Sequence, residues 1–76
     1  MKDKQLLALG RQIRRLREAR KLSQEGFAAA AGLDRAYYGG IERGERNVAA
    51  LNLIKIAAAL EVGVGELFPR VQAMRR

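Results

Sequence analysis

Helix-starting and helix-ending residues alternate closely between Ser23 and Asp34, and this spacing constrains the chain more than any other feature. Ser23 is a favoured N-cap for a helix over about 24–31. Gly32 follows that helix at the position where a left-handed C-cap prefers glycine. Asp34 lies just beyond and caps a further helix over about 35–43. Two helices joined by a turn of three or four residues have the geometry of a helix-turn-helix.

The segments on either side also follow helical periodicity, which predicts an all-α fold of five helices. The first helix is expected from about Asp3 to Arg20, and the fourth from about Val48 to Leu60. A last short helix is expected over about 66–74, with Pro69 near the start of its turn. The apolar faces expected to form the core contain Leu6, Leu9, Ile13, Leu16, Phe27, Ala30, Leu53, Ile56, Ala57 and Leu60.

The length of the chain allows a single domain. The chain has 76 residues, and a domain of this size buries only about 60% of the surface that its unfolded chain exposes. Such a thin core makes an oligomer a natural way to bury more surface. We expect residues 1–76 to be one complete domain, with a core over about 6–68 and a basic tail over 69–76. This arrangement leaves no effector domain, so no small-molecule effector is expected.

The residue types that the chain lacks exclude most enzyme classes. It has no Cys and no His, which removes disulfides, zinc fingers, thiol catalysis and imidazole acid–base chemistry. It also has no Thr, and its only Ser is Ser23. The carboxylates are scattered along the chain rather than clustered. We therefore expect no enzyme activity, no metal site and no cofactor.

The charge balance favours an anionic partner. Lys and Arg number 15 against 8 Asp and Glu, for a formal net charge of +7. A chain this basic favours nucleic acid first and an acidic membrane surface second, with a merely charge-rich soluble surface as the alternative. The longest apolar runs, 27–31 and 56–60, are far shorter than the ~20 residues of a membrane span. We expect a cytoplasmic protein that is nucleoid-associated when bound to DNA.

Short motifs occur in a fixed order over most of the chain, from about residue 9 to residue 68, and together they form a register that is more specific than any single motif. These are Leu16-Arg17-Glu18, Leu22-Ser23-Gln24-Glu25, Ala29–Ala31 with Gly32, Ile41-Glu42-Arg43-Gly44, Leu53, Ile56-Ala57, Ala59-Leu60 and Glu66-Leu67-Phe68. The register resembles the phage-repressor-type helix-turn-helix family, the XRE (Cro/C1-type) family. That resemblance implies a lambda-repressor-like DNA-binding domain in which the second and third helices form the helix-turn-helix.

A narrower pattern lies in the third helix and the loop after it. Leu33-Asp34-Arg35, Tyr37 and the run from Gly40 to Asn47 resemble the controller proteins of restriction–modification systems. The resemblance implies a short homodimer that binds palindromic operators on double-stranded DNA and regulates its own gene together with the endonuclease gene. Other small phage-type repressors and antitoxin-like regulators share much of the pattern and stay open as alternatives. The departures are Ala36, Tyr38 and Gly39, where the pattern has a small hydroxyl residue, an aliphatic residue and Ser.

The third helix supplies most of the candidate base contacts. In a helix-turn-helix, the first residues of this helix reach base edges in the major groove, and Arg35 can bond O6 and N7 of one guanine. The alternative role of Arg35 is a surface ion pair with Asp34 or Glu42. Ala36 either touches a thymine methyl group or touches nothing. The predicted base contacts are Arg35, Ala36, Tyr37, Gly39 and Arg46.

A second group of residues is expected to hold phosphates and set the register without reading sequence. Gln24 opens the second helix, where a helix N-terminus attracts phosphate, and plain solvent exposure is its alternative. Gly39 and Gly40 each cost about 0.5–1 kcal/mol inside a helix. They indicate either a close approach to DNA or loose packing. The predicted phosphate contacts are Gln24, Tyr37, Gly40, Arg43 and Asn47.

Two further predictions concern the protein's own structure. By the family resemblance, Arg17 and Glu42 form an internal ion pair that joins the first helix to the third. Leu51 and Ile54 lie off the expected core face of their helix, and with Val64 they are the candidates for a dimer interface. A two-fold dimer would place two recognition helices about 34 Å apart, one turn of DNA, on a palindromic site.

Two other classes of function stay open. The same fold can serve as a protein-interaction adaptor with an acidic partner, and the positive charge alone can drive nonspecific nucleoid or RNA binding. Phosphate contacts make affinity fall as salt rises in all the DNA-binding cases. Only a sequence-specific reader keeps a tight site at physiological salt, so the response to salt and sequence together separates these classes.

Overall fold

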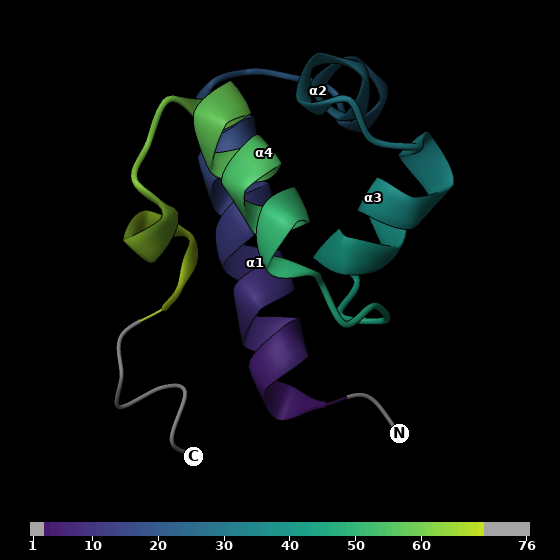
Figure 1. The fold of residues 1–76 in the computed structure, drawn as a ribbon, viewed down its shortest axis with the longest axis vertical. Coiled ribbons are helices and arrows are strands. Elements are labelled where there is room, and N and C mark those ends of the chain that lie inside the picture. The colour runs from purple at the N-terminus through teal and green to yellow at the C-terminus, as the bar shows by residue number, and fades with distance from the viewer. Residues whose placement is uncertain (1–2, 70–76) are drawn as a thin grey trace.

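The computed structural model describes residues 3–69, and its first element is the long helix α1 (Lys4–Ala19), shown in Figure 1. Asp3 caps this helix, because its carboxylate accepts hydrogen bonds from the backbone N–H groups of Gln5 and Leu6 at 2.7 and 3.1 Å. Leu9 and Ile13 bury the apolar face of α1. The predicted first helix is therefore confirmed, with its ends one residue inside the predicted ones.

The second and third helices form the predicted pair, α2 (Gln24–Ala31) and α3 (Arg35–Glu42). Helix α2 has the predicted bounds, and α3 ends at Glu42 with Arg43 as its C-cap. Both helices pack on one another, α2 also packs on α4, and α3 also packs on α1. In Figure 1 the pair lies to one side of α1 and α4, and α4 crosses in front of α1.

The fourth helix, α4 (Ala50–Leu60), starts two residues later than the predicted start at Val48. Its N-cap is Ala49, which has no side chain that can accept a hydrogen bond, so no capping group marks this start in the sequence. The other end of α4 is tied to α1, since the Arg20 Nη1 group donates to the Leu60 carbonyl at 2.9 Å.

The predicted fifth helix is wrong in the part that the structure describes. The chain there forms a 3₁₀ helix, η1 (Val64–Leu67), which ends at Phe68 in an extended conformation with φ −96° and ψ 139°. Phe68 precedes Pro69, and the proline ring disfavours helical backbone at the residue before it. Residues 70–74 of the predicted helix lie outside the described residues, as does the predicted tail beyond Pro69. Within residues 3–69 no helix is long and apolar enough to span a membrane.

The core lies where α1, α2, α3, α4 and η1 meet. Its largest fully buried side chains are Tyr38, Phe27, Ile13, Ile41, Ile56, Leu60 and Leu67. The expected inward position of Ala30 is wrong: Ala30 is exposed, whereas Ala28 and Ala31 are buried. A run of four alanines has no hydropathy pattern of its own, so the orientation of α2 is set by Phe27. The Phe27 ring packs on Tyr38 with 5.1 Å between ring centroids.

Helix α1 approaches the end of α3 closely at Gly10. A Cβ atom at Gly10 would lie 2.5 Å from the carbonyl oxygens of both Ile41 and Glu42. Any side chain at this position would therefore push α1 and α3 apart. Gly44 also lies against α1, and its φ of +75° suits glycine. These two glycines set the distance between α1 and the C-terminal end of α3.

Candidate nucleic-acid interface

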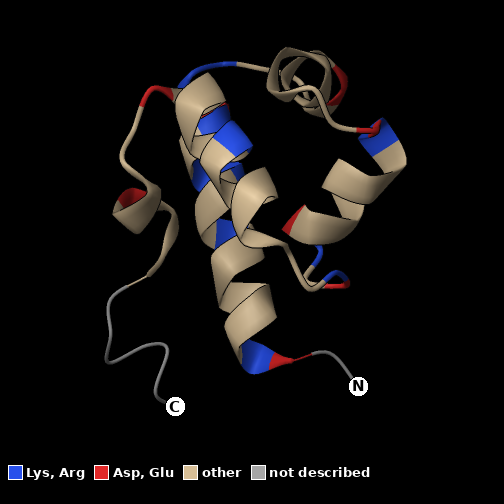
Figure 2. Ribbon diagram, in the orientation of Figure 1, with Lys and Arg blue, Asp and Glu red and all other residues tan. Residues whose placement is uncertain are grey.

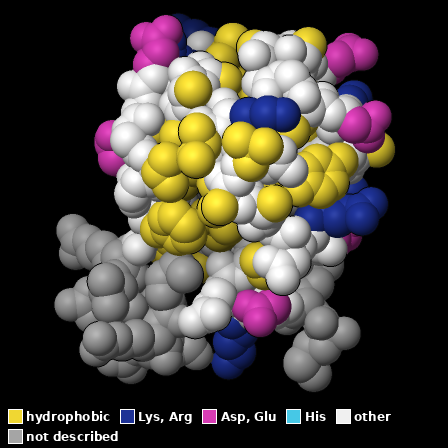
Figure 3. Space-filling model, in the orientation of Figure 1, with side chains coloured by type: hydrophobic (Ala, Val, Ile, Leu, Met, Phe, Trp, Pro, Cys, Tyr) yellow, Lys and Arg dark blue, Asp and Glu magenta, His cyan; other side chains and the backbone are white. Residues whose placement is uncertain are grey.

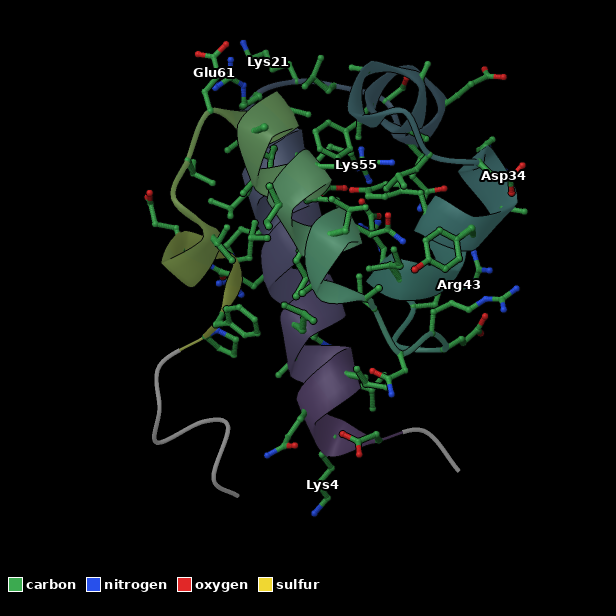
Figure 4. All side chains as sticks on the ribbon, viewed as in Figure 1. Lys4, Lys21, Asp34, Arg43, Lys55 and Glu61 are labelled. Atoms are coloured by element: carbon green, nitrogen blue, oxygen red, sulfur yellow. The ribbon has the colours of Figure 1, made fainter. Side chains whose placement is uncertain are left out.

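The ends of α2 and the start of α3 are set by the three residues that the sequence singles out. The Ser23 hydroxyl accepts from the Gly26 N–H at 2.9 Å, and Gly32 ends α2 in the left-handed region with φ +73°. The Asp34 carboxylate accepts from the Tyr37 N–H at 3.0 Å and so starts α3. Figure 4 shows Asp34 at the start of α3 and Arg43 near its other end. The caps thus fix where the recognition helix α3 begins and how it leaves α2.

Arg35 and Ala36 are both exposed on the first turn of α3. In the part of the chain that the structure describes, Arg35 forms no ion pair with Asp34 or Glu42, so the alternative role expected for it is absent there. Figure 2 shows positive charge at the start of α3 and in the loop beyond its end. The guanidinium of Arg35 is thus available to an anionic or hydrogen-bond-accepting partner.

The single carboxylate within α3 is buried and held by four donors. Glu42 accepts from Arg17 Nε at 2.7 Å, from Arg17 Nη2 at 3.0 Å, from Gln24 Nε2 at 3.0 Å and from the Tyr38 hydroxyl. The expected Arg17–Glu42 ion pair is therefore present, and Gln24 and Tyr38 join it. The Arg17 side chain is 9% exposed and that of Glu42 is 2% exposed.

The surroundings of Glu42 shift the pKa values of the groups around it. Burial alone would raise the pKa of Glu42, but the hydrogen bonds from Arg17, Gln24 and Tyr38 outweigh burial and hold the pKa below its ordinary value. The hydrogen bond to Glu42 raises the pKa of Arg17, and burial followed by the contact with Glu42 raises the pKa of Tyr38. Glu42 is thus a carboxylate at neutral pH, and its charge is neutralised inside the protein.

Gln24 belongs to this network rather than to the surface alone. Its amide nitrogen donates a hydrogen bond to Glu42, and its side chain is only partly buried. Gln24 therefore links the first turn of α2 to the end of α3. Its expected phosphate contact stays a prediction, and plain solvent exposure does not describe it.

The two glycines inside α3 make space for arginines. Both are buried. A Cβ at Gly39 would lie 3.0 Å from Arg43 Nη1, and a Cβ at Gly40 would lie 2.9 Å from Arg46 Cγ. Loose packing does not describe this arrangement, because arginine side chains fill the space beside both glycines. These side chains cover both positions. The contacts of Gly39 with a base and of Gly40 with a phosphate stay predictions.

Tyr37 and Arg46 lie together, with a partner that the sequence does not single out. The Arg46 guanidinium carbon lies 5.8 Å from the centroid of the Tyr37 ring. The Tyr37 hydroxyl accepts a hydrogen bond from Asn52 Nδ2 on α4 at 3.0 Å. No local motif marks Asn52, because its partner lies 15 residues away in the sequence. This group joins α3, the following loop and α4.

Arg43 and Asn47 are exposed at the end of α3 and in the loop. Arg43 Nε donates to Glu45 Oε1 at 3.0 Å, and the two side chains are 54% and 42% exposed. No feature of the sequence predicts this pair. Asn47 lies near the N-terminus of α4, at the surface.

An apolar surface lies on α4 and η1, away from the core. Leu51, Ile54 and Val64, the expected dimer contacts, are 62%, 53% and 37% exposed. Phe68 is also exposed, at 37%, whereas Leu67 is fully buried. Of these two neighbours, only Leu67 therefore belongs to the core. Figure 3 shows hydrophobic side chains gathered over α4 and η1 on one face of the molecule.

The described residues contain no group of three or more His, Cys, Asp or Glu side chains that would hold a metal ion. In the same part of the chain, every buried side-chain nitrogen and oxygen has a hydrogen-bond partner. The exposed charged groups around α3 are the guanidinium groups of Arg35, Arg43 and Arg46 and the carboxylates of Asp34 and Glu45.

The chain is similar in sequence and fold to known regulators. The helix-turn-helix family matches it over residues 13–67. The control protein C.MunI from a Mycoplasma species is 46% identical over 67 residues, which cover 87% of this chain and 90% of that protein. The restriction–modification controller protein C.AhdI from Aeromonas hydrophila has a TM-score of 0.82 and 51% identity, covering 83% of this chain and 96% of that one. SinR, a master regulator for biofilm formation solved in complex with DNA, has a TM-score of 0.75 and 32% identity, covering 78% of this chain and 95% of that one.

Proposed function

This chain belongs to the helix-turn-helix family of DNA-binding transcription regulators, and from that premise we propose that it is a restriction–modification controller protein. It acts as a homodimer on a palindromic operator and regulates its own gene together with the endonuclease gene. The family is one of regulators and not of enzymes. The proposal places the protein in the cytoplasm, on the nucleoid when it is bound to DNA.

One observation carries the proposal: the acid of the recognition helix is internal, whereas its first arginine is exposed. Glu42 is the single carboxylate within α3, and Arg17 neutralises it in the core. A carboxylate at the surface of α3 would repel phosphates. With Glu42 buried, the exposed face of α3 presents Arg35 and Ala36 to the major groove, where Arg35 bonds guanine and Ala36 contacts a thymine methyl group.

In the proposed complex, phosphate contacts on both sides of α3 hold the helix in the groove. The phosphates of the DNA backbone are held by Tyr37, by Asn47 and by the first turn of α2 at Gln24. Arg46 reaches a base from its position over the Tyr37 ring. Gly40 supports this arrangement because its lack of a side chain leaves space for the Arg46 stem.

The apolar surface on α4 and η1 supports the homodimer. Leu51 and Ile54 are more than half exposed, and Val64 lies on the adjoining 3₁₀ helix. Removing apolar surface from water stabilises a complex by roughly 25 cal/mol per Å². Because the core of this chain is so small, we take a second copy of the chain to be the partner that covers these side chains.

The test is selection of bound sequences from a random duplex pool at physiological salt. A palindrome with half-sites about one helical turn apart is the expected result. Its presence upstream of this protein's own gene and a neighbouring endonuclease gene would distinguish a controller from other small repressors. An enriched palindrome elsewhere would leave a DNA-binding repressor. Binding without preference that vanishes as salt rises would overturn sequence-specific reading and favour an adaptor or a nonspecific binder.

A further inference from the structure

Residues 35, 39 and 43 follow one stripe of α3 at four-residue steps, and the middle one has no side chain. Arg35 and Arg43 are exposed, whereas Gly39 between them is buried. Gly39 is buried because other side chains cover it: Arg43 Nη1 lies 3.0 Å and Gln24 Oε1 lies 3.5 Å from the position of a Cβ atom. The place of a side chain at residue 39 is thus taken by the guanidinium of Arg43.

Helix geometry explains how Arg43 reaches this place. Side chains on a helix point toward its N-terminus, over the preceding turn. Arg43 is the C-cap of α3, so its head lies back over Gly39 rather than out along the following loop. The Cζ atom is 3.9 Å from the Cβ position of Gly39, which is ordinary van der Waals contact. Arg43 therefore packs on the middle of the recognition helix.

Glu45 fixes the orientation of this guanidinium. Its carboxylate accepts from Arg43 Nε at 3.0 Å. In the described part of the chain, the two Nη groups of Arg43 have no protein acceptor. Two adjacent N–H donors are what the O6 and N7 atoms of guanine bind. The carboxylate beside the arginine also repels phosphates, which makes a base edge the better partner.

We infer that Arg43 is a specificity-determining residue that reads a guanine in the middle of the half-site, in the place of a side chain at Gly39. Glu45 is the positioning residue for this contact. The inference rests on the proposed function and deepens it. It exchanges the roles expected from the sequence, in which Gly39 touches a base and Arg43 holds a phosphate.

The test uses the selected operator and its set of single base-pair substitutions, with binding measured for the wild type and for Arg43→Ala. We expect Arg43→Ala to lose about 10- to 100-fold of discrimination at one G·C pair and to keep the preference at the other positions. An even loss of affinity across all sequences would assign Arg43 to a phosphate and overturn the inference. Arg14→Ala is the matched control, since Arg14 also forms an exposed pair, with Glu18 at 3.1 Å on α1. We expect this control to keep every preference.

A second variant tests the position without removing the charge. In Gly39→Ala, the new Cβ displaces the Arg43 head, so discrimination should fall at the same G·C pair while helix propensity rises. Unchanged discrimination in Gly39→Ala would overturn the claim that this place matters.

The two proposals fail differently. A wild type that selects no sequence refutes sequence-specific reading altogether. A wild type that selects a palindrome, with Arg43→Ala equally selective, refutes only the role of Arg43.

Discussion

Replacing Glu42 by Gln tests whether the buried network holds the recognition helix in place. Oε1 accepts from Arg17 and Gln24, and Oε2 accepts from Arg17 and Tyr38. A glutamine has one oxygen, so either orientation of its amide turns an NH₂ group toward two donors, one of which belongs to Arg17. The variant therefore leaves a buried guanidinium poorly paired. Breaking a buried pair in this way costs about 3–5 kcal/mol.

In a domain of this size, that cost lowers the unfolding midpoint by roughly 12–40 °C. The assay is thermal unfolding followed by far-UV circular dichroism at one fixed protein concentration, because dimerisation makes the midpoint concentration-dependent. Glu18→Gln is the matched control, since the Arg14–Glu18 pair is exposed and should change stability by no more than about 1 kcal/mol.

The double variant Arg17→Met with Glu42→Gln separates lost charge pairing from lost packing. It removes the unpaired guanidinium, and the introduced amide would still offer groups to Gln24 and Tyr38. Part of the lost stability should therefore return. A midpoint of Glu42→Gln that matches the Glu18→Gln control would refute the reasoning, because it would mean that the network contributes no more than a surface pair.

Two further predictions follow from the same region. Because the folded-state pKa of Glu42 lies below its ordinary value, its contribution is complete above that ordinary value and is lost as pH falls through the folded-state pKa. Urea unfolding over an acid pH series should show this loss, and Glu42→Gln should flatten it; an unchanged slope in the variant would assign the loss to other groups. Gly10→Ala places a Cβ 2.5 Å from two carbonyl oxygens and should cost about 1–3 kcal/mol. Gly65→Ala, which meets nothing within 4 Å, should stay within about 0.5 kcal/mol of the wild type, and equal effects of the two would contradict the close approach of α1 to α3.

Local signals in the sequence are sufficient to predict the helix-turn-helix itself. Ser23, Gly32 and Asp34 act through backbone groups within four residues of themselves, so their roles can be predicted without knowledge of the fold. The prediction fails at the end of the chain because apolar residues around Phe68 suggest a helix that the following proline prevents. It places the start of α4 too early because no capping side chain marks that start.

The candidate site depends more on contacts between distant residues. Asn52 meets Tyr37 across 15 residues, and Gln24 meets Glu42 across 18. No periodicity or motif reports such contacts. The loss of helix stability at the two glycines of α3 can be predicted from the sequence. The reason for the glycines cannot, since it is the position of the Arg43 and Arg46 side chains in space. Only the resemblance to the family predicts the Arg17–Glu42 pair, because its two residues lie 25 positions apart.

The close docking of α3 on α1 has a consequence for engineering. The segment from Ser23 to Gly44 contains the whole helix-turn-helix and looks transferable to another protein. The position of its recognition helix, however, depends on two residues of α1 outside the segment, the Arg17 guanidinium and Gly10. A graft of this segment onto another scaffold would carry an unpaired Glu42 and a helix end with nothing to rest against. A successful transplant must therefore reproduce Arg17 and Gly10 at the same spacing on a supporting helix.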